Sequence, residues 1–264
     1  MGDELLYDLD LWLIFLFSIG AFFLFTEIGF HLGRRAASKT TDHARSQVGT
    51  IQAAILGLLA LLLGFTFAMA MTRFDVRKQM VLDEANAIGT TFLRAQLLPE
   101  PQRREISDLL RRYVKVRLDF YEAGTDDDKL DAVSKATAKL QAQLWELGRT
   151  LSEKDPRAVS YGMFLQSLNE VIDLHNKRLT ALENHVPEII LILLYFVAMV
   201  ATALIGYGCG LGEVRNFFVT VVASILIAAV IFVIIDLDRP RRGLIRVSQA
   251  RMLELRDSMA GTQP

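Results

Sequence analysis

Residues 49–98, GTIQAAILGLLALLLGFTFAMAMTRFDVRKQMVLDEANAIGTTFLRAQLL, form one uninterrupted helical pattern. The run from Ile55 to Met71 holds no charge and no proline, and the pattern continues without a break into the polar residues that follow. Pro99 and Pro101 end it. Because a bilayer core accommodates about 20 apolar residues, these residues predict one long helix that begins in a membrane and ends well outside it.

The two faces of this helix differ in composition. One face carries small residues at steps of three and four, which let helix backbones approach closely in lipid: Ala53, Gly57, Ala60, Gly64 and Ala68. The other carries larger residues and ends in a cation: Ile55, Leu59, Leu62, Thr66, Met69 and Arg73, with Phe65 beside them. We expect the small face to be a helix-packing surface. The large face either contacts lipid or lines an apolar constriction with Arg73 at its mouth, since hydrophobic constrictions gate channels.

Composition indicates a molecule that is part membrane and part water-exposed. Of 264 residues, 52% are hydrophobic and 22% are charged, which fits neither an ordinary soluble domain nor a protein wholly in the bilayer. The net charge of −1 gives no electrostatic basis for binding nucleic acid. A single cysteine, Cys209, excludes an internal disulfide and a cysteine-based zinc site. The acidic start MGDELLYDLD is unlike a secretory signal, so we expect the first apolar segment to be retained.

The rest of the chain predicts an all-α membrane protein with four transmembrane helices. The other three spans are expected at Leu11–Phe30, Ile189–Tyr207 and Phe217–Ile235. Between the second and third spans, apolar periodicity predicts water-exposed helices over Gln102–Glu122 and Asp127–Leu151, and one from Arg157 that continues, kinked at Pro187, into the third span. Glycines 206, 208, 210 and 212 predict a short turn around Cys209.

These segments divide the chain into four parts. The first two spans occupy residues 1–72, a helical region residues 73–186, the last two spans residues 187–238, and a basic tail residues 239–264. Four spans place both termini and the helical region on one side. Basic residues are more numerous there, so the positive-inside rule makes that side cytoplasmic and the membrane an inner, cell membrane, although the basic loop at residues 33–47 argues the other way.

Charged residues near the membrane are the candidate polar sites. Glu27, an acid in the last turn of the first span, either pairs with His31, Arg34 or Arg35 or has a function in transport. At the end of the fourth span we expect a structural charge lock formed by Asp236, Asp238, Arg239, Arg241 and Arg242. These residues are expected to pair with one another or with Arg73, Arg77 and Asp83. We find no nucleotide loop, zinc motif or nucleophile elbow, and we expect no enzyme activity, cofactor or metal.

Three segments carry a family resemblance. They are EIGFHLGRR at residues 27–35, DEANAIGT at residues 83–90 and DLDRPRRG at residues 236–243. Together they resemble the bacterial bestrophin-like membrane proteins. The resemblance implies four membrane helices, a cytosolic helical region, and a ring-shaped homo-oligomer, a pentamer, that passes chloride-like anions. The acidic calcium clasp of animal bestrophins has no counterpart after residue 243, so the resemblance does not extend to calcium gating.

Three functions are consistent with these residues. The first is a homo-oligomeric ion channel, anion-conducting by resemblance, with the apolar constriction on the second span. The second is a non-conducting membrane scaffold or sensor that binds a partner through its water-exposed helices. The third is an ion- or proton-coupled transporter that uses Glu27, against which the lack of an inverted repeat counts mildly.

Overall fold

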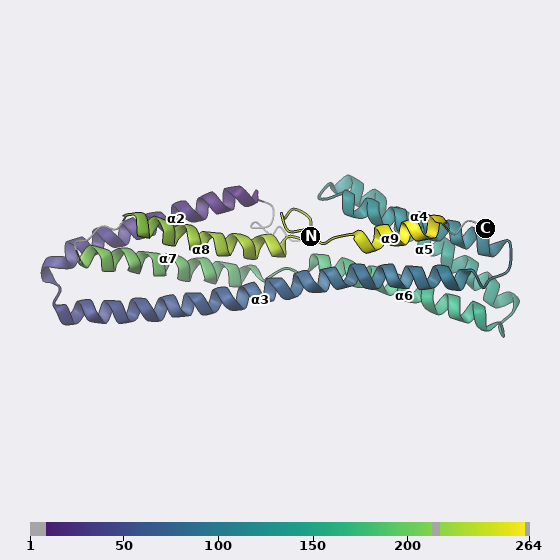
Figure 1. Cartoon of the computed structure of the whole chain (residues 1–264), viewed down its shortest axis with the longest axis horizontal. Coiled ribbons are helices and arrows are strands. Elements are labelled where there is room, and N and C mark those ends of the chain that lie inside the picture. Colours follow the sequence, from purple (N-terminus) through teal and green to yellow (C-terminus); the bar gives the residue numbers. More distant parts are fainter. Residues whose placement is uncertain (1–8, 213–216, 262–264) are drawn as a thin grey trace. The chain divides into compact units, whose positions relative to one another are not determined.

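The computed structural model describes residues 9–212 and 217–261, and every regular element in those ranges is a helix (Figure 1). This confirms the all-α fold. The elements are α2 (Leu11–Ala36), η1 (Ala37–Lys39), α3 (Asp42–Ala95), α4 (Gln102–Glu122), α5 (Asp127–Lys154), α6 (Val159–Glu183), α7 (Glu188–Leu211), α8 (Phe217–Asp238) and α9 (Ala250–Gly261).

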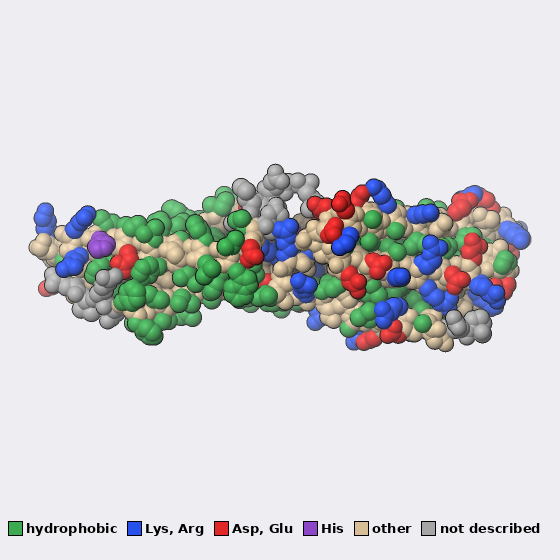
Figure 2. All heavy atoms as spheres, turned by 90° about the horizontal axis from the view of Figure 1, so that it is seen from above, with side chains coloured by type: hydrophobic (Ala, Val, Ile, Leu, Met, Phe, Trp, Pro, Cys, Tyr) green, Lys and Arg blue, Asp and Glu red, His purple; other side chains and the backbone are tan. Residues whose placement is uncertain are grey.

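The chain divides into two compact units. Unit 1 comprises Met1–Thr72 and His185–Arg239, and unit 2 comprises Arg73–Asn184 and Pro240–Pro264. Four helical segments are long and apolar enough to cross a membrane, and they contain α2, the first part of α3, α7 and α8. Hydrophobic side chains cover much of the visible surface of unit 1, whereas Lys, Arg, Asp and Glu are spread over that of unit 2 (Figure 2). The expected four membrane spans are therefore present.

Unit 1 is organised around α2, which packs against both α7 and α8. Asp10 caps the helix, because its Oδ1 accepts a hydrogen bond from the Trp12 backbone N–H at 2.8 Å. Aromatic rings then fill the space between helices: Phe15 of α2 meets Phe232 of α8, and Phe22 stacks on Tyr195 of α7. These contacts make α2, α7 and α8 one packed group.

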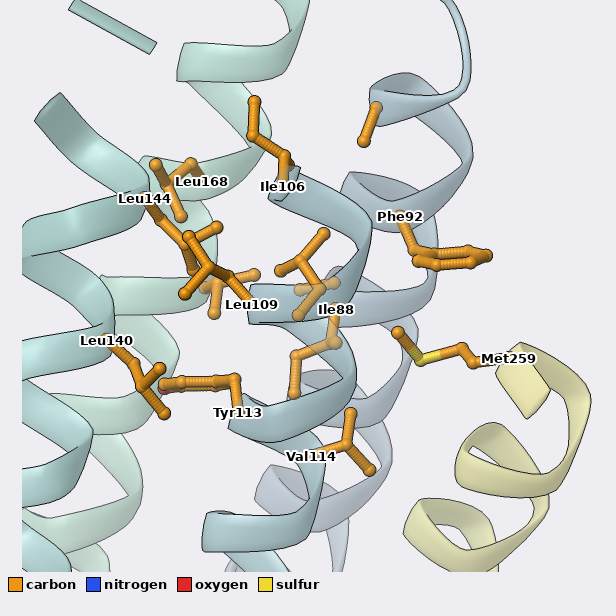
Figure 3. Close-up of a cluster of buried hydrophobic side chains, with 14 of the residues drawn as sticks. Ile88, Phe92, Ile106, Leu109, Tyr113, Val114, Leu140, Leu144, Leu168 and Met259 are labelled. Carbon is orange, nitrogen blue, oxygen red and sulfur yellow. The ribbon is translucent and has the colours of Figure 1, made fainter. Parts of the chain in front are cut away.

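Unit 2 is a helical bundle with one apolar core. The second half of α3 and helices α4, α5, α6 and α9 all contribute to it (Figure 3). Its labelled members are Ile88, Phe92, Ile106, Leu109, Tyr113, Val114, Leu140, Leu144, Leu168 and Met259. Met252 and Met259 bring α9 into the core. The sequence prediction of a basic tail at residues 239–264 does not include this helix.

The chain between α6 and α7 is broken rather than kinked, contrary to the sequence prediction. Residues 184–187 are not helical. A residue before proline is disfavoured in the helical region, and Val186 instead donates its backbone N–H to Asp238 Oδ2 of α8 at 2.6 Å. The predicted glycine turn is also wrong, because Gly206, Gly208 and Gly210 all lie inside α7.

Candidate functional site

The packing of α2 against α7 in unit 1 depends on glycine. A Cβ added at Gly29 would lie 1.9 Å from the Ala203 carbonyl oxygen, and one at Gly206 would lie 1.9 Å from that of Thr26. Gly33 and Gly210, one turn further along each helix, are nearly as tight, with a Cβ at 2.2 Å from the carbonyl oxygen of Tyr207 and at 2.3 Å from that of Phe30. Small residues four apart allow this approach in lipid, so these four glycines fix α2 against α7.

We predict that Gly29→Ala destabilises the protein by about 1–3 kcal/mol or more, since the added methyl group has no room and the two backbones must separate. Gly20→Ala on the same helix is the matched control, because a Cβ there meets nothing within 4 Å. Thermal unfolding of the detergent-solubilised protein measures both variants. Equal melting temperatures would show that the glycines do not set the α2–α7 distance.

The first half of α3 turns its small face away from the chain. All five small residues of the predicted packing face are exposed: Ala53, Gly57, Ala60, Gly64 and Ala68. A Cβ at Gly57 or Gly64 would meet nothing within 4 Å. The small face is therefore not used for packing within the chain, and its predicted role as an interface can only concern another molecule.

The large face of α3 is divided between covered and open positions. Leu59 and Thr66 are each only 2% exposed. Their side chains are thus covered within the chain itself, and the pore role predicted for these two residues stays a prediction. Leu62 and Met69 are half-buried, and Phe65 is 64% exposed. At steps of three and four residues, Leu62, Phe65 and Met69 form a stripe between the covered side and the small face.

The structure places two of the predicted charged residues near the spans, Glu27 and Arg73. Glu27 is partly buried in α2, and its Oε2 lies 4.0 Å from Nε2 of His31, one of the partners expected for it. Arg73 lies on α3, directly after the last residue of unit 1, and is half-buried. Arg77, one turn further, donates from Nε and Nη2 to the carbonyl oxygens of Ala181 and Asn184.

The end of α8 carries two buried carboxylates. Asp236 and Asp238 are each 1% exposed. Nδ1 of His185 lies 3.0 Å from the carbonyl oxygen of Asp238, and Arg239 Nη1 donates to the carbonyl oxygen of Leu9 at 2.7 Å. These bonds tie α8 to the segments that precede α7 and α2. That all five charged residues at this end act as one lock stays a prediction.

Unit 2 contains a buried charge cluster that sequence reasoning missed. Glu84 of α3 is 0% exposed, and so is Arg117 of α4, whose Nε donates to Glu84 Oε1 at 2.7 Å. Arg178 of α6 donates to the other carboxylate oxygen of Glu84 and, from Nη2, to Oε1 of Gln249 at 2.9 Å. One carboxylate therefore joins α3, α4 and α6, and Arg178 extends the network to the start of α9.

The electrostatics of this cluster favour an ionised Glu84. Burial raises the pKa of its carboxyl, but the charges and hydrogen bonds of Arg117 and Arg178 outweigh burial and leave the pKa below its usual value. Nearby, burial and the charge of Arg117 lower the pKa of His175 to about 4. Burial, together with the charge of Glu84, raises the pKa of Tyr113 to about 12. At neutral pH the imidazole and the phenol are thus both uncharged.

We predict that His175 makes stability fall as the pH drops from 6.5 towards 4. In that window the unfolded chain takes up a proton that the folded protein does not bind, so the free energy of unfolding decreases. The total effect is about 3 kcal/mol. His175→Gln removes the titrating group and should flatten this part of the profile, as measured by chemical denaturation at several pH values. An unchanged slope in the variant would contradict the assignment.

Fold and site together define a class: an all-helical membrane protein with four candidate spans and a second helical unit that contains a buried charge cluster. The family described as Bestrophin-like domain matches residues 20–252. The chain belongs to this family. At the level of the family, this membership supports a bestrophin-type channel, since the family is known for channels rather than enzymes.

Solved structures with this fold include those of a bacterial bestrophin homologue. A mutated form of a bacterial bestrophin homologue from Klebsiella pneumoniae superposes with a TM-score of 0.64 at 15% identity, over 95% of this chain and 98% of that one. Another structure of the homologue from that organism gives a TM-score of 0.62 at 16% identity, over 97% of this chain and 100% of that one. At such identities the likeness shows the fold. No curated protein matches the sequence.

Proposed function

We propose that this chain assembles with copies of itself into an ion channel that passes anions more readily than cations. The observation that carries the proposal is the open side of α3 within unit 1. A stripe of exposed small residues at steps of three and four along a membrane helix is typical of a surface that packs against another helix, and here it comprises Ala53, Gly57, Ala60, Gly64 and Ala68. Since the chain itself does not cover this face, a second copy is the natural occupant. The resemblance to bestrophins favours five copies.

The apolar stripe beside the small face is the proposed constriction. If the small face contacts a neighbouring protomer and the side with Leu59 and Thr66 packs within its own chain, the positions between them face the axis. These are Leu62, Phe65 and Met69, of which Phe65 is the most exposed. An ion loses hydration in such a collar without gaining ligands, so the collar resists ion entry until it widens or is wetted.

The anion preference is assigned to Arg73. It lies four residues beyond Met69 on the same helix, so each protomer would add one positive charge at the end of the constriction.

We also propose that unit 2 stands on the cytoplasmic side of an inner membrane, with both termini. Support comes from the basic residues that flank the spans there: Arg73, Arg77, Lys78, Lys177, Arg178, Arg239, Arg241, Arg242 and Arg246.

We predict that Arg73→Glu shifts selectivity from anions towards cations, because it reverses the sign of the charged ring. Reversal potentials of the reconstituted protein in a chloride gradient measure this. Lys78→Glu is the matched control, since it makes the same charge change at an exposed position five residues further on. An unchanged reversal potential in Arg73→Glu, with currents present, would leave Arg73 as a membrane-boundary anchor and move the selectivity determinant elsewhere.

A further inference from the structure

The Glu84 cluster leaves donors of one buried guanidinium unused. Arg117 is fully buried, and its Nε is bonded to Glu84. Its Nη1 and Nη2 are also buried, and neither has a hydrogen-bond partner among the residues that the structure describes. A buried charged donor without a partner costs several kcal/mol relative to one that is bonded. Such groups are therefore normally satisfied by a water molecule or an ion.

The charges in the cluster do not balance. Two guanidinium groups, of Arg117 and Arg178, share the single carboxylate of Glu84. His175 cannot supply a negative charge, and the low pKa keeps it from adding a positive one at neutral pH. The buried cluster consequently carries one positive charge in excess, in a setting where the apolar core of unit 2 screens charge far less than water does.

A third guanidinium, that of Arg241, also lies over the Phe120 ring. The Cζ of Arg117 is 4.9 Å from the centroid of this ring, and that of Arg241 is 4.7 Å from it. The ring stabilises both cations through its face but accepts no conventional hydrogen bond. Arg241 also has the carboxylates of Glu183 and Asp127 in its surroundings. Because Arg241 has carboxylates of its own nearby, the uncompensated positive charge is that of the two arginines bonded to Glu84, Arg117 and Arg178.

We propose that Nη1 and Nη2 of Arg117 bind a small monovalent anion of the halide class inside unit 2. One negative charge balances the cluster, whereas a multivalent anion such as phosphate would overcompensate it. A halide accepts hydrogen bonds from any direction, so it can use both N–H groups and needs no further polar partner. This site is separate from the proposed conduction path, which concerns α3 in unit 1, and it does not depend on whether the protein conducts.

Bromide in place of chloride gives the direct test. In crystals of the full-length protein grown in bromide, we expect an anomalous diffraction peak within hydrogen-bond distance of Nη1 and Nη2 of Arg117. In solution, the melting temperature of the purified protein should be higher in chloride or bromide than in gluconate at the same ionic strength, because a ligand that binds only the folded state stabilises it.

Two variants separate binding from general screening. Arg117→Gln leaves Glu84 and Arg178 as a balanced pair, so the melting temperature should no longer depend on chloride. Arg112→Gln removes the same charge from an exposed position on α4 and should keep the dependence. Equal loss in both variants, or equal melting in chloride and gluconate for the unmodified protein, would overturn the proposal. Bromide crystals without a peak at Arg117 would do so even if Arg117→Gln failed to fold.

Discussion

Glu84→Gln is expected to lower the free energy of unfolding by about 3–5 kcal/mol, since it removes the carboxylate that is bonded to the two buried guanidinium groups of Arg117 and Arg178. The amide keeps the shape of the side chain, yet it offers one acceptor oxygen and no charge. Arg117 and Arg178 would then lie buried beside each other without compensation. Chemical denaturation, followed by circular dichroism, measures the change.

Glu146→Gln is the matched control for this substitution. Glu146 also bonds an arginine, Arg149, but on the exposed surface of α5, where water screens the pair. We expect little change there. The two variants should differ in acid as well: the stability that Glu84 supplies is complete above its ordinary pKa of 4.5 and is lost as the pH falls through its lower, folded value. If the two variants unfold alike, the buried cluster adds no more to the stability of unit 2 than an exposed ion pair does.

Gly64→Leu is expected to abolish assembly while leaving the protomer folded. A Cβ at Gly64 meets nothing within 4 Å in the chain, so the protomer itself has room for the larger side chain. A neighbouring helix packed closely on the small face of α3 would not have room. Native mass spectrometry in detergent should show oligomers for the unmodified protein and single chains for the variant, with similar melting curves.

Gly20→Leu on α2 serves as the control for added bulk on an open glycine. Its Cβ position is also free of neighbours, and it lies off the proposed interface. We expect this variant to assemble normally. If Gly64→Leu forms the same oligomers as the unmodified protein, the small face of α3 is covered by lipid. The proposed position of the apolar stripe on the pore axis would then be contradicted, because it requires a neighbouring protomer on the small face.

The helices with strong local signals were predictable from sequence. Residues 102–122 form α4 as expected, because Pro101 precedes a regular apolar period. The four spans follow from their apolar length. Helix α9 was missed because its buried contribution rests largely on Met252 and Met259, too sparse a pattern to distinguish from a polar tail. The break before α7 depends on a bond from Val186 to a distant carboxylate, which no local pattern indicates.

The sites were harder to predict because they depend on tertiary partners. Glu84 is 33 residues from Arg117 and 94 from Arg178 along the chain. One signal was present: Arg117 falls on the apolar face of α4, four residues after Tyr113. The spacing of Gly29 with Gly33, and of Gly206 with Gly210, likewise matched the rule used for α3. In α3, composition alone did not show which face the chain covers.

Planar bilayer recording of the purified, full-length protein tests the central claim most directly. We predict unitary current steps whose reversal potential in a chloride gradient lies near the chloride equilibrium potential. The preparation should first be shown to be oligomeric, so that a negative result concerns conduction and not assembly. Bilayers that stay silent with the intact oligomer inserted would contradict the channel and favour a non-conducting membrane scaffold.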